Sequence, residues 1–129
     1  MTPLQADKLM SHAREHLPEE ACAILAGTMD ADVHVVREIM VLENIDHSPV
    51  SFSISGAELI RAYEQADRLG LDVIGVFHSH PGSAAKPSLK DQRYMDINPV
   101  IWPIYSGRDG NMRAWISDGG ICEIPVVIS

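Results

Sequence analysis

Two histidines and an aspartate occur at a spacing that suits one zinc ion. His78 and His80 lie two residues apart, and Asp91 follows eleven residues after His80. A catalytic zinc ion takes three protein ligands, keeps one position open for water, and works beside a carboxylate that moves protons. Glu20, which directly precedes a short apolar run, is a candidate for that carboxylate. These residues predict a zinc hydrolase in which His78, His80 and Asp91 bind Zn²⁺.

Each of these residues also has a purely structural explanation. His78 and His80 lie at i and i+2 of a predicted strand, so they share one face, but many histidines simply pack. Asp91 fits the first turn of a helix capped by Ser88, where the helix dipole favours an anion. The Ser88 hydroxyl could equally donate to a developing oxyanion. Glu20, at the edge of an apolar strand, would have a raised pKa suited to proton transfer.

A second metal motif lies near the N-terminus. Residues 12–16 read His-Ala-Arg-Glu-His, the inverted zinc-peptidase pattern, and His12 and His16 would lie one helical turn apart. The apolar positions of this segment are instead Leu9 and Ala13, and no third ligand follows at helical spacing. We therefore interpret His12 and His16 as part of a solvated helix face. The zinc-deaminase signature is absent from the chain.

The elements that must position these side chains follow from apolar spacing and turn residues. Thr2 and Gln5 predict a capping box at the start of a first helix, which Pro18 ends, and Ser55 and Glu58 predict a second capping box. Strand 71–80 is apolar on both faces and is therefore expected to be central. Predicted helices cover 3–17, 56–69 and 88–95, and predicted strands cover 21–26, 33–42, 71–80, 100–105, 112–116 and 121–128.

The order of these elements predicts an α/β fold, a mixed β-sheet flanked by helices. The two longer helices are expected to pack through apolar stripes. The first stripe comprises Leu4, Leu9, Met10, Ala13 and Leu17, and the second comprises Leu59, Ile60, Tyr63, Ala66 and Leu69.

Composition excludes several classes of protein. With 129 residues the chain is expected to form one domain, and its net charge of −8 disfavours nucleic acid and anionic membranes as partners. No apolar stretch approaches a membrane span, and no signal peptide is expected after Met1. Cys22 and Cys122 lie far apart and form no CxxC pair, so we expect Cys22 to be a small buried residue in a cytoplasmic protein without disulfides.

Two segments together resemble the JAMM (MPN+, JAB1/MPN/Mov34) metalloprotease family. Residues 18–27 read Pro-Glu-Glu-Ala-Cys-Ala-Ile-Leu-Ala-Gly, and residues 78–91 read His-x-His-Pro-x6-Ser-x-x-Asp. The resemblance covers residues 1–129 as a single JAMM/MPN+ domain and implies the MPN fold, which is cytidine-deaminase-like. It also implies that His78, His80 and Asp91 bind Zn²⁺, that Glu20 is the general base and acid, and that Ser88 stabilises the oxyanion.

The resemblance further implies a metallopeptidase or isopeptidase that cuts after the Gly-Gly tail of a ubiquitin-like or sulfur-carrier protein. The short chain resembles prokaryotic stand-alone members that process sulfur carriers or remove ubiquitin-like modifiers from lysines, acting as a monomer or homodimer. Ala23 departs from the glycine that many such members have there, which adds one methyl group. Two alternatives are a non-catalytic MPN-like binding module with a structural metal and a cell-wall or phage peptidase, which usually has a second peptidase domain. The complete set of site residues favours the metallopeptidase or isopeptidase over both alternatives.

Overall fold

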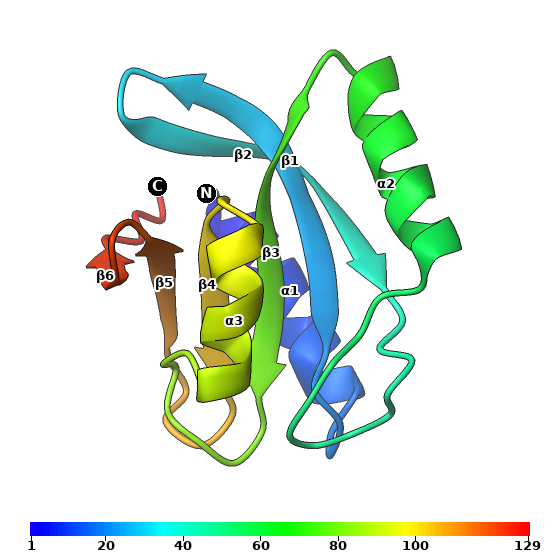
Figure 1. Cartoon of the computed structure of the whole chain (residues 1–129), viewed down its shortest axis with the longest axis vertical. Coiled ribbons are helices and arrows are strands. Elements are labelled where there is room, and N and C mark those ends of the chain that lie inside the picture. The colour runs from blue at the N-terminus through cyan, green and yellow to red at the C-terminus, as the bar shows by residue number, and fades with distance from the viewer.

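The computed structural model describes residues 1–129 as one mixed six-stranded sheet with helices against both faces (Figure 1). The strand order is β2-β1-β3-β4-β5-β6, and only β3 and β4 are parallel neighbours, so the predicted α/β architecture is confirmed. None of the helices has the length and hydropathy of a membrane span. The elements are α1 (Pro3–Glu15), β1 (Cys22–Asp30), β2 (Val33–Leu42), α2 (Gly56–Arg68), β3 (Asp72–His80), α3 (Leu89–Ile97), β4 (Trp102–Ser106), β5 (Met112–Ser117) and β6 (Ile121–Ile124).

The helix starts show how far local sequence determines structure. The Thr2 hydroxyl accepts from the Gln5 amide and the Gln5 side chain accepts from the Thr2 amide, which confirms the first capping box. Ser55 caps α2 by accepting from the Glu58 amide. The predicted second capping box is nevertheless incomplete, because Glu58 does not return a bond to Ser55 and instead lies 3.1 Å from Arg61 of the same helix.

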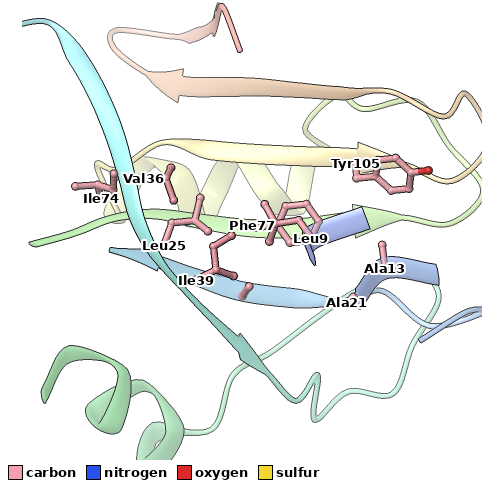
Figure 2. Close-up of a cluster of buried hydrophobic side chains, with 10 residues drawn as sticks. Leu9, Ala13, Ala21, Leu25, Val36, Ile39, Ile74, Phe77 and Tyr105 are labelled. Atoms are coloured by element: carbon pink, nitrogen blue, oxygen red, sulfur yellow. The ribbon is translucent and has the colours of Figure 1, made fainter. Parts of the chain in front are cut away.

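The larger core lies between α1 and the sheet (Figure 2). Leu9 of α1 and Phe77 of β3 are fully buried there, with Leu25 of β1 beside them. Burying side chains of this size stabilises the fold by roughly 1.5–3 kcal/mol each, so this contact fixes α1 on one face of β1 and β3. The opposite face of the sheet carries α2, which contacts β1, β2 and β3, and α3, which contacts β5, and it also carries the candidate site (Figure 1).

The interpretation of His12 as a solvated residue is wrong. Its side chain is only 7% exposed, and Nε2 lies 2.9 Å from the carbonyl oxygen of Cys22. The helix is rotated so that Leu4 of the predicted stripe is exposed, while Leu9 and His12 face the sheet. Leu17 is also exposed, because the helix ends at Glu15 and Leu17 lies beyond it. The carbonyl provides the partner that a buried imidazole requires, and burial lowers the pKa of His12.

The C-terminal ends of two strands, β1 and β6, differ from the predicted ends by four residues, and both differences have causes in backbone chemistry. β1 continues through Gly27 to Asp30, so Gly27 does not end the strand. This glycine lies at a bulge, where a Cβ atom would stand 1.9 Å from the Val35 carbonyl oxygen, and the position therefore requires a residue without a side chain. β6 stops at Ile124 instead of continuing to residue 128, since Pro125 has no amide to donate to the sheet. The remaining tail runs back to the N-terminus, where the Met1 amine donates to Val127.

The predicted apolar stripe of α2 does not form the contact with the sheet. The buried side chains of this helix are Ala62 and Ala66, and only Ala66 belongs to the predicted stripe. Ile60 and Tyr63 are 61% and 53% exposed. Small side chains allow the helix to approach the strands closely, so the larger side chains are displaced outward.

Candidate metal centre and active site

Antiparallel pairing of β1 with β3 brings Glu20 to the end of the central strand. Cys22 pairs with His78 in the register, and beyond it the Ser79 amide donates to the Ala21 carbonyl at 3.0 Å. Glu20 therefore lies across from the C-terminal end of β3, where both predicted histidine ligands are found. The histidines occupy alternate positions of the strand and share the face opposite α1.

The helix after β3 brings Ser88 and Asp91 to the same place. Parallel strands need a crossover, and α3 provides it between β3 and β4. At its start the Ser88 hydroxyl accepts from the Asp91 amide at 3.1 Å, and Asp91 Oδ2 accepts from the Ser88 amide at 3.0 Å. The same Oδ2 atom lies 3.1 Å from Nε2 of both His78 and His80. The capping role of Asp91 and a role toward a ligand are thus compatible.

The converging donor atoms have the chemistry of a cation site. His78 Nε2 and His80 Nε2 lie 3.0 Å apart, and both contact the Asp91 carboxylate. His80 Nδ1 lies 2.9 Å from the Ala84 carbonyl, which can only accept, so a neutral His80 directs its Nε2 lone pair into the cluster. Two imidazole nitrogens and a carboxylate oxygen that face one another in this way are suitable ligand atoms for a metal ion, so the site could bind one.

Glu20 belongs to an overlapping donor set. Glu20, His78 and His80 can each offer an atom within 4.8 Å of the other two. Asp91 lies closer, at 3.1 Å from both imidazole nitrogens, and it is held there by the Ser88 amide. The tighter and better supported set is therefore His78, His80 and Asp91, with Glu20 at its margin.

The two carboxyl groups have opposite electrostatic environments. Burial raises the pKa of Glu20 to about 8, with His80 lowering it and Asp91 raising it to smaller extents. Burial also disfavours a charged Asp91, but its hydrogen bonds to His78, His80 and the Ser88 amide outweigh that effect and hold its pKa well below its usual range. Two carboxyl groups with pKa values pushed apart are typical of a site that separates proton transfer from charge stabilisation.

Glu20 should make the stability of the metal-free protein depend on pH. Between pH 4.5, the ordinary pKa, and about 8, the folded protein keeps a proton that the unfolded chain has released. This contribution is complete below pH 4.5 and is lost as the pH rises through 8. We therefore expect Glu20→Gln to be more stable than wild type above pH 8, by about 2–4 kcal/mol, and nearly equal to it below pH 4.5. Urea unfolding across this range, with chelator present, measures the difference. Parallel curves would contradict the burial of this carboxyl group.

Aromatic side chains enclose His78. Phe52 stacks on its ring with centroids 4.7 Å apart and planes 25° apart, and Trp102 meets it edge-on at 6.1 Å. His78 is fully buried, its Nδ1 has no hydrogen-bond partner, and burial lowers its pKa. Burial therefore favours the neutral form of the ring, the form in which histidine binds metals.

The segment 82–87, between β3 and α3, is held by the predicted ligand His80 and by two side chains of the sheet, Ser106 and Trp115, that the sequence did not single out as part of a site. Three successive carbonyls of the segment accept hydrogen bonds from side chains, which keeps the His80 ring and the start of α3 in place. The donors are Ser106 Oγ to Ser83 at 2.7 Å, His80 Nδ1 to Ala84 at 2.9 Å and Trp115 Nε1 to Ala85 at 2.9 Å. Because Ser106 and Trp115 come from β4 and β5, only the sheet order could have revealed them.

The structure thus brings all five residues of the predicted site together at one end of β3. They come from the start of β1, the end of β3 and the first turn of α3: Glu20, His78, His80, Ser88 and Asp91. His12 and His16 are not part of any cluster of three metal-ligand side chains, and their ring nitrogens bind backbone carbonyls. Cys22 is buried as predicted, with its pKa raised to about 12 by burial, and no disulfide is present.

A mixed sheet with a buried histidine–carboxylate cluster at the end of its central strand defines an α/β protein with a candidate metal centre. Residues 5–118 match the family described as prokaryotic homologs of the JAB domain. The chain belongs to this family, and the resemblance seen in its motifs is confirmed.

Relatives and a solved structure agree with this assignment. A desampylase of Pyrococcus furiosus is 34% identical over 84% of this chain and 76% of its own length. A CysO-cysteine peptidase of Mycobacterium tuberculosis is 31% identical over 92% of this chain and 82% of its own. A solution structure of a protein from Desulfitobacterium hafniense has a TM-score of 0.88 and 32% identity, covering 99% of this chain and 90% of that one.

Proposed function

We propose that this protein is a zinc-dependent peptidase or isopeptidase that hydrolyses the bond after the Gly-Gly tail of a ubiquitin-like or sulfur-carrier protein. The observation that carries the proposal is the convergence of His78 Nε2, His80 Nε2 and Asp91 Oδ2 at 3.0–3.1 Å beside the buried Glu20. The desampylase and the CysO-cysteine peptidase among the relatives support the reaction class. Residues 1–129 would form the single catalytic domain.

His78, His80 and Asp91 would hold the ion. Two imidazole nitrogens and one carboxylate oxygen form a common ligand set of catalytic zinc sites, which leaves a fourth position for a reactant. When bound, such an ion supplies Lewis-acid polarisation of a carbonyl group and makes water more acidic. Asp91 would also contribute negative charge that partly neutralises the cation.

Glu20 would move the proton. Its carboxyl group has no hydrogen-bond partner at Oε1 and lies within reach of the ligand nitrogens. As a carboxylate it takes a proton from the attacking water, and as an acid it gives that proton to the departing amine. The approach of a cation would lower the pKa of this group toward the range in which it can act as a base.

Ser88 would stabilise the oxyanion, because its oxygen accepts the capping bond from Asp91 and its hydroxyl proton stays free to donate. Ser88→Ala should lower kcat by about 10²–10³-fold through loss of this donor. It should also lower stability by about 1 kcal/mol through loss of the cap. Kinetics and urea unfolding measure the two effects.

Thr2→Ala is the matched control for Ser88→Ala. It removes an equivalent capping box at the start of α1 and should lower stability to a similar extent without lowering kcat. Equal losses of kcat in the two variants would assign Ser88 a capping role alone.

A glycine tail suits the recessed position of the site. Glu20, His80 and Asp91 are only 4%, 5% and 6% exposed, so a substrate must bring its backbone close to buried groups. Two successive glycines carry no Cβ atoms that would block this approach. The net charge of −8 argues against nucleic acid as the partner, and a cytoplasmic location and a monomer or homodimer remain predictions.

The test uses the metal-loaded full chain and the ubiquitin-like and sulfur-carrier proteins encoded in the same genome. Each candidate is prepared in two forms, one with an extra amino acid after Gly-Gly and one joined through Gly-Gly to the lysine of a peptide. Mass spectrometry that finds cleavage after Gly-Gly in either form, and none with chelator, supports the proposal. Failure to cut any candidate, together with unfolding on metal removal, would favour the non-catalytic binding module.

A further inference from the structure

Asn44 is a buried side chain outside the motif, and its hydrogen bonds are fully used. It follows β2, is 3% exposed, and donates from Nδ2 to two carbonyl oxygens, those of Glu20 and Ser51, each at 2.9 Å. Its Oδ1 accepts from the amides of Asp46 at 3.0 Å and Ser53 at 3.1 Å. Two donors and two lone pairs are all that an asparagine amide offers, so segment 44–53 is folded around this side chain.

The same segment holds both backbone groups of Glu20. The Glu20 amide donates to the Ser48 carbonyl at 2.8 Å, and the Glu20 carbonyl accepts from Asn44. The carboxylate itself has no comparable support, because Oε1 is buried without a partner. The position of the carboxylate therefore depends on how firmly its backbone is held.

We infer that Asn44 is a positioning residue that keeps Glu20 in reach of the metal centre through the Glu20 carbonyl. The inference rests on the proposed function, since it concerns the proton transfer assigned there to Glu20. Glu20 lies before β1, outside the paired register, so sheet pairing alone does not fix its conformation. Asn44, which lies just after the end of β2, constrains the Glu20 backbone through its hydrogen bond to the Glu20 carbonyl.

Segment 44–53 also touches other parts of the site. Phe52 stacks on His78, and the Asp46 carboxylate lies 4.0 Å from Lys90 beside Asp91. A change at Asn44 could therefore disturb the ligands as well as the base. Metal content must be measured beside the kinetics, so that loss of the ion is separated from loss of positioning.

The test compares Asn44→Ala with two controls. Ser51→Ala removes the exposed bond from Ser51 Oγ to Asp46 in the same segment but leaves every bond of Asn44 intact. Ile39→Val trims a core side chain on the α1 face and lowers stability by about 0.5–1.5 kcal/mol without touching the segment. If Asn44→Ala does not fold, Asn44→Asp keeps both acceptor contacts and loses the donations to the Glu20 and Ser51 carbonyls.

We expect Asn44→Ala to lower kcat by about 10–100-fold, the usual effect of losing a supporting group, with KM and metal content nearly unchanged. Neither control should show this pattern. The decisive readout is the pair Glu20→Gln and Glu20→Gln/Asn44→Ala. If Asn44 acts through Glu20, the double variant should be no slower than Glu20→Gln alone.

Two results would overturn the inference, and they differ from a failure of the proposed function. An Asn44→Ala enzyme with wild-type kcat overturns it, as does a further loss of kcat in the Glu20→Gln background equal to the loss in wild type. Either result leaves an active wild-type peptidase in place. A metal-loaded wild type that cuts no Gly-Gly substrate overturns both the proposed function and the role of Asn44.

Discussion

Replacing His78 and His80 together with alanine is expected to abolish metal binding and hydrolysis. Wild-type protein should contain about one zinc ion per chain, held by three protein ligands, and the double variant should contain none. The remaining ligand, Asp91, supplies one carboxylate oxygen, which is too little to retain the ion. Elemental analysis after dialysis measures the metal, and the cleavage assay measures the activity.

The matched control is His12→Gln/His16→Gln, which alters the other histidine pair. Glutamine can still offer a hydrogen bond near the Cys22 carbonyl that His12 now contacts. This variant should retain zinc and activity, with some loss of stability because His12 is buried. Zinc that persists in the His78/His80 variant but disappears in the control would move the metal centre to the N-terminal helix.

Glu20→Gln is expected to lower kcat by about 10²–10⁴-fold while leaving the metal content unchanged. Glutamine has nearly the same shape as glutamate, so the buried position should be kept, but an amide cannot accept and release the proton. The variant therefore separates proton transfer from packing. Single-turnover kinetics with the metal-loaded variant gives the loss in the chemical step.

Glu19→Gln is the neighbouring control, and it should remain active. Glu19 lies 3.4 Å from His47 at the surface and makes no contact in the cluster. Full activity of Glu20→Gln would contradict the assigned mechanism. Loss of the ion from Glu20→Gln would instead make Glu20 a ligand, the alternative left by its position within 4.8 Å of both histidines.

Local rules accounted for much of the fold. The capping box at Thr2, the strand at 33–42 and the cap at Ser88 agree with the sequence-based predictions, because each depends on neighbouring residues. The exceptions have tertiary causes. Gly27 lies within a strand, because the Val35 carbonyl of β2 occupies the space that a side chain at this position would need. α2 packs on the sheet through alanines, whose small side chains allow a close approach.

The proposed ligand residues could be predicted from short-range geometry. His78 and His80 share a face because strands alternate, and Ser88 and Asp91 meet because a helix start needs a cap. These are short-range geometries that the residue types specify wherever the chain folds.

The groups around these residues depend on tertiary contacts that local geometry does not specify. Glu20 reaches the histidines through the register of β1 on β3, and Asn44 reaches Glu20 through the end of β2. His12 was buried by the rotation of α1 on the same sheet. Contacts between residues far apart in sequence depend on which faces the whole chain buries, and local spacing carries little information about that choice.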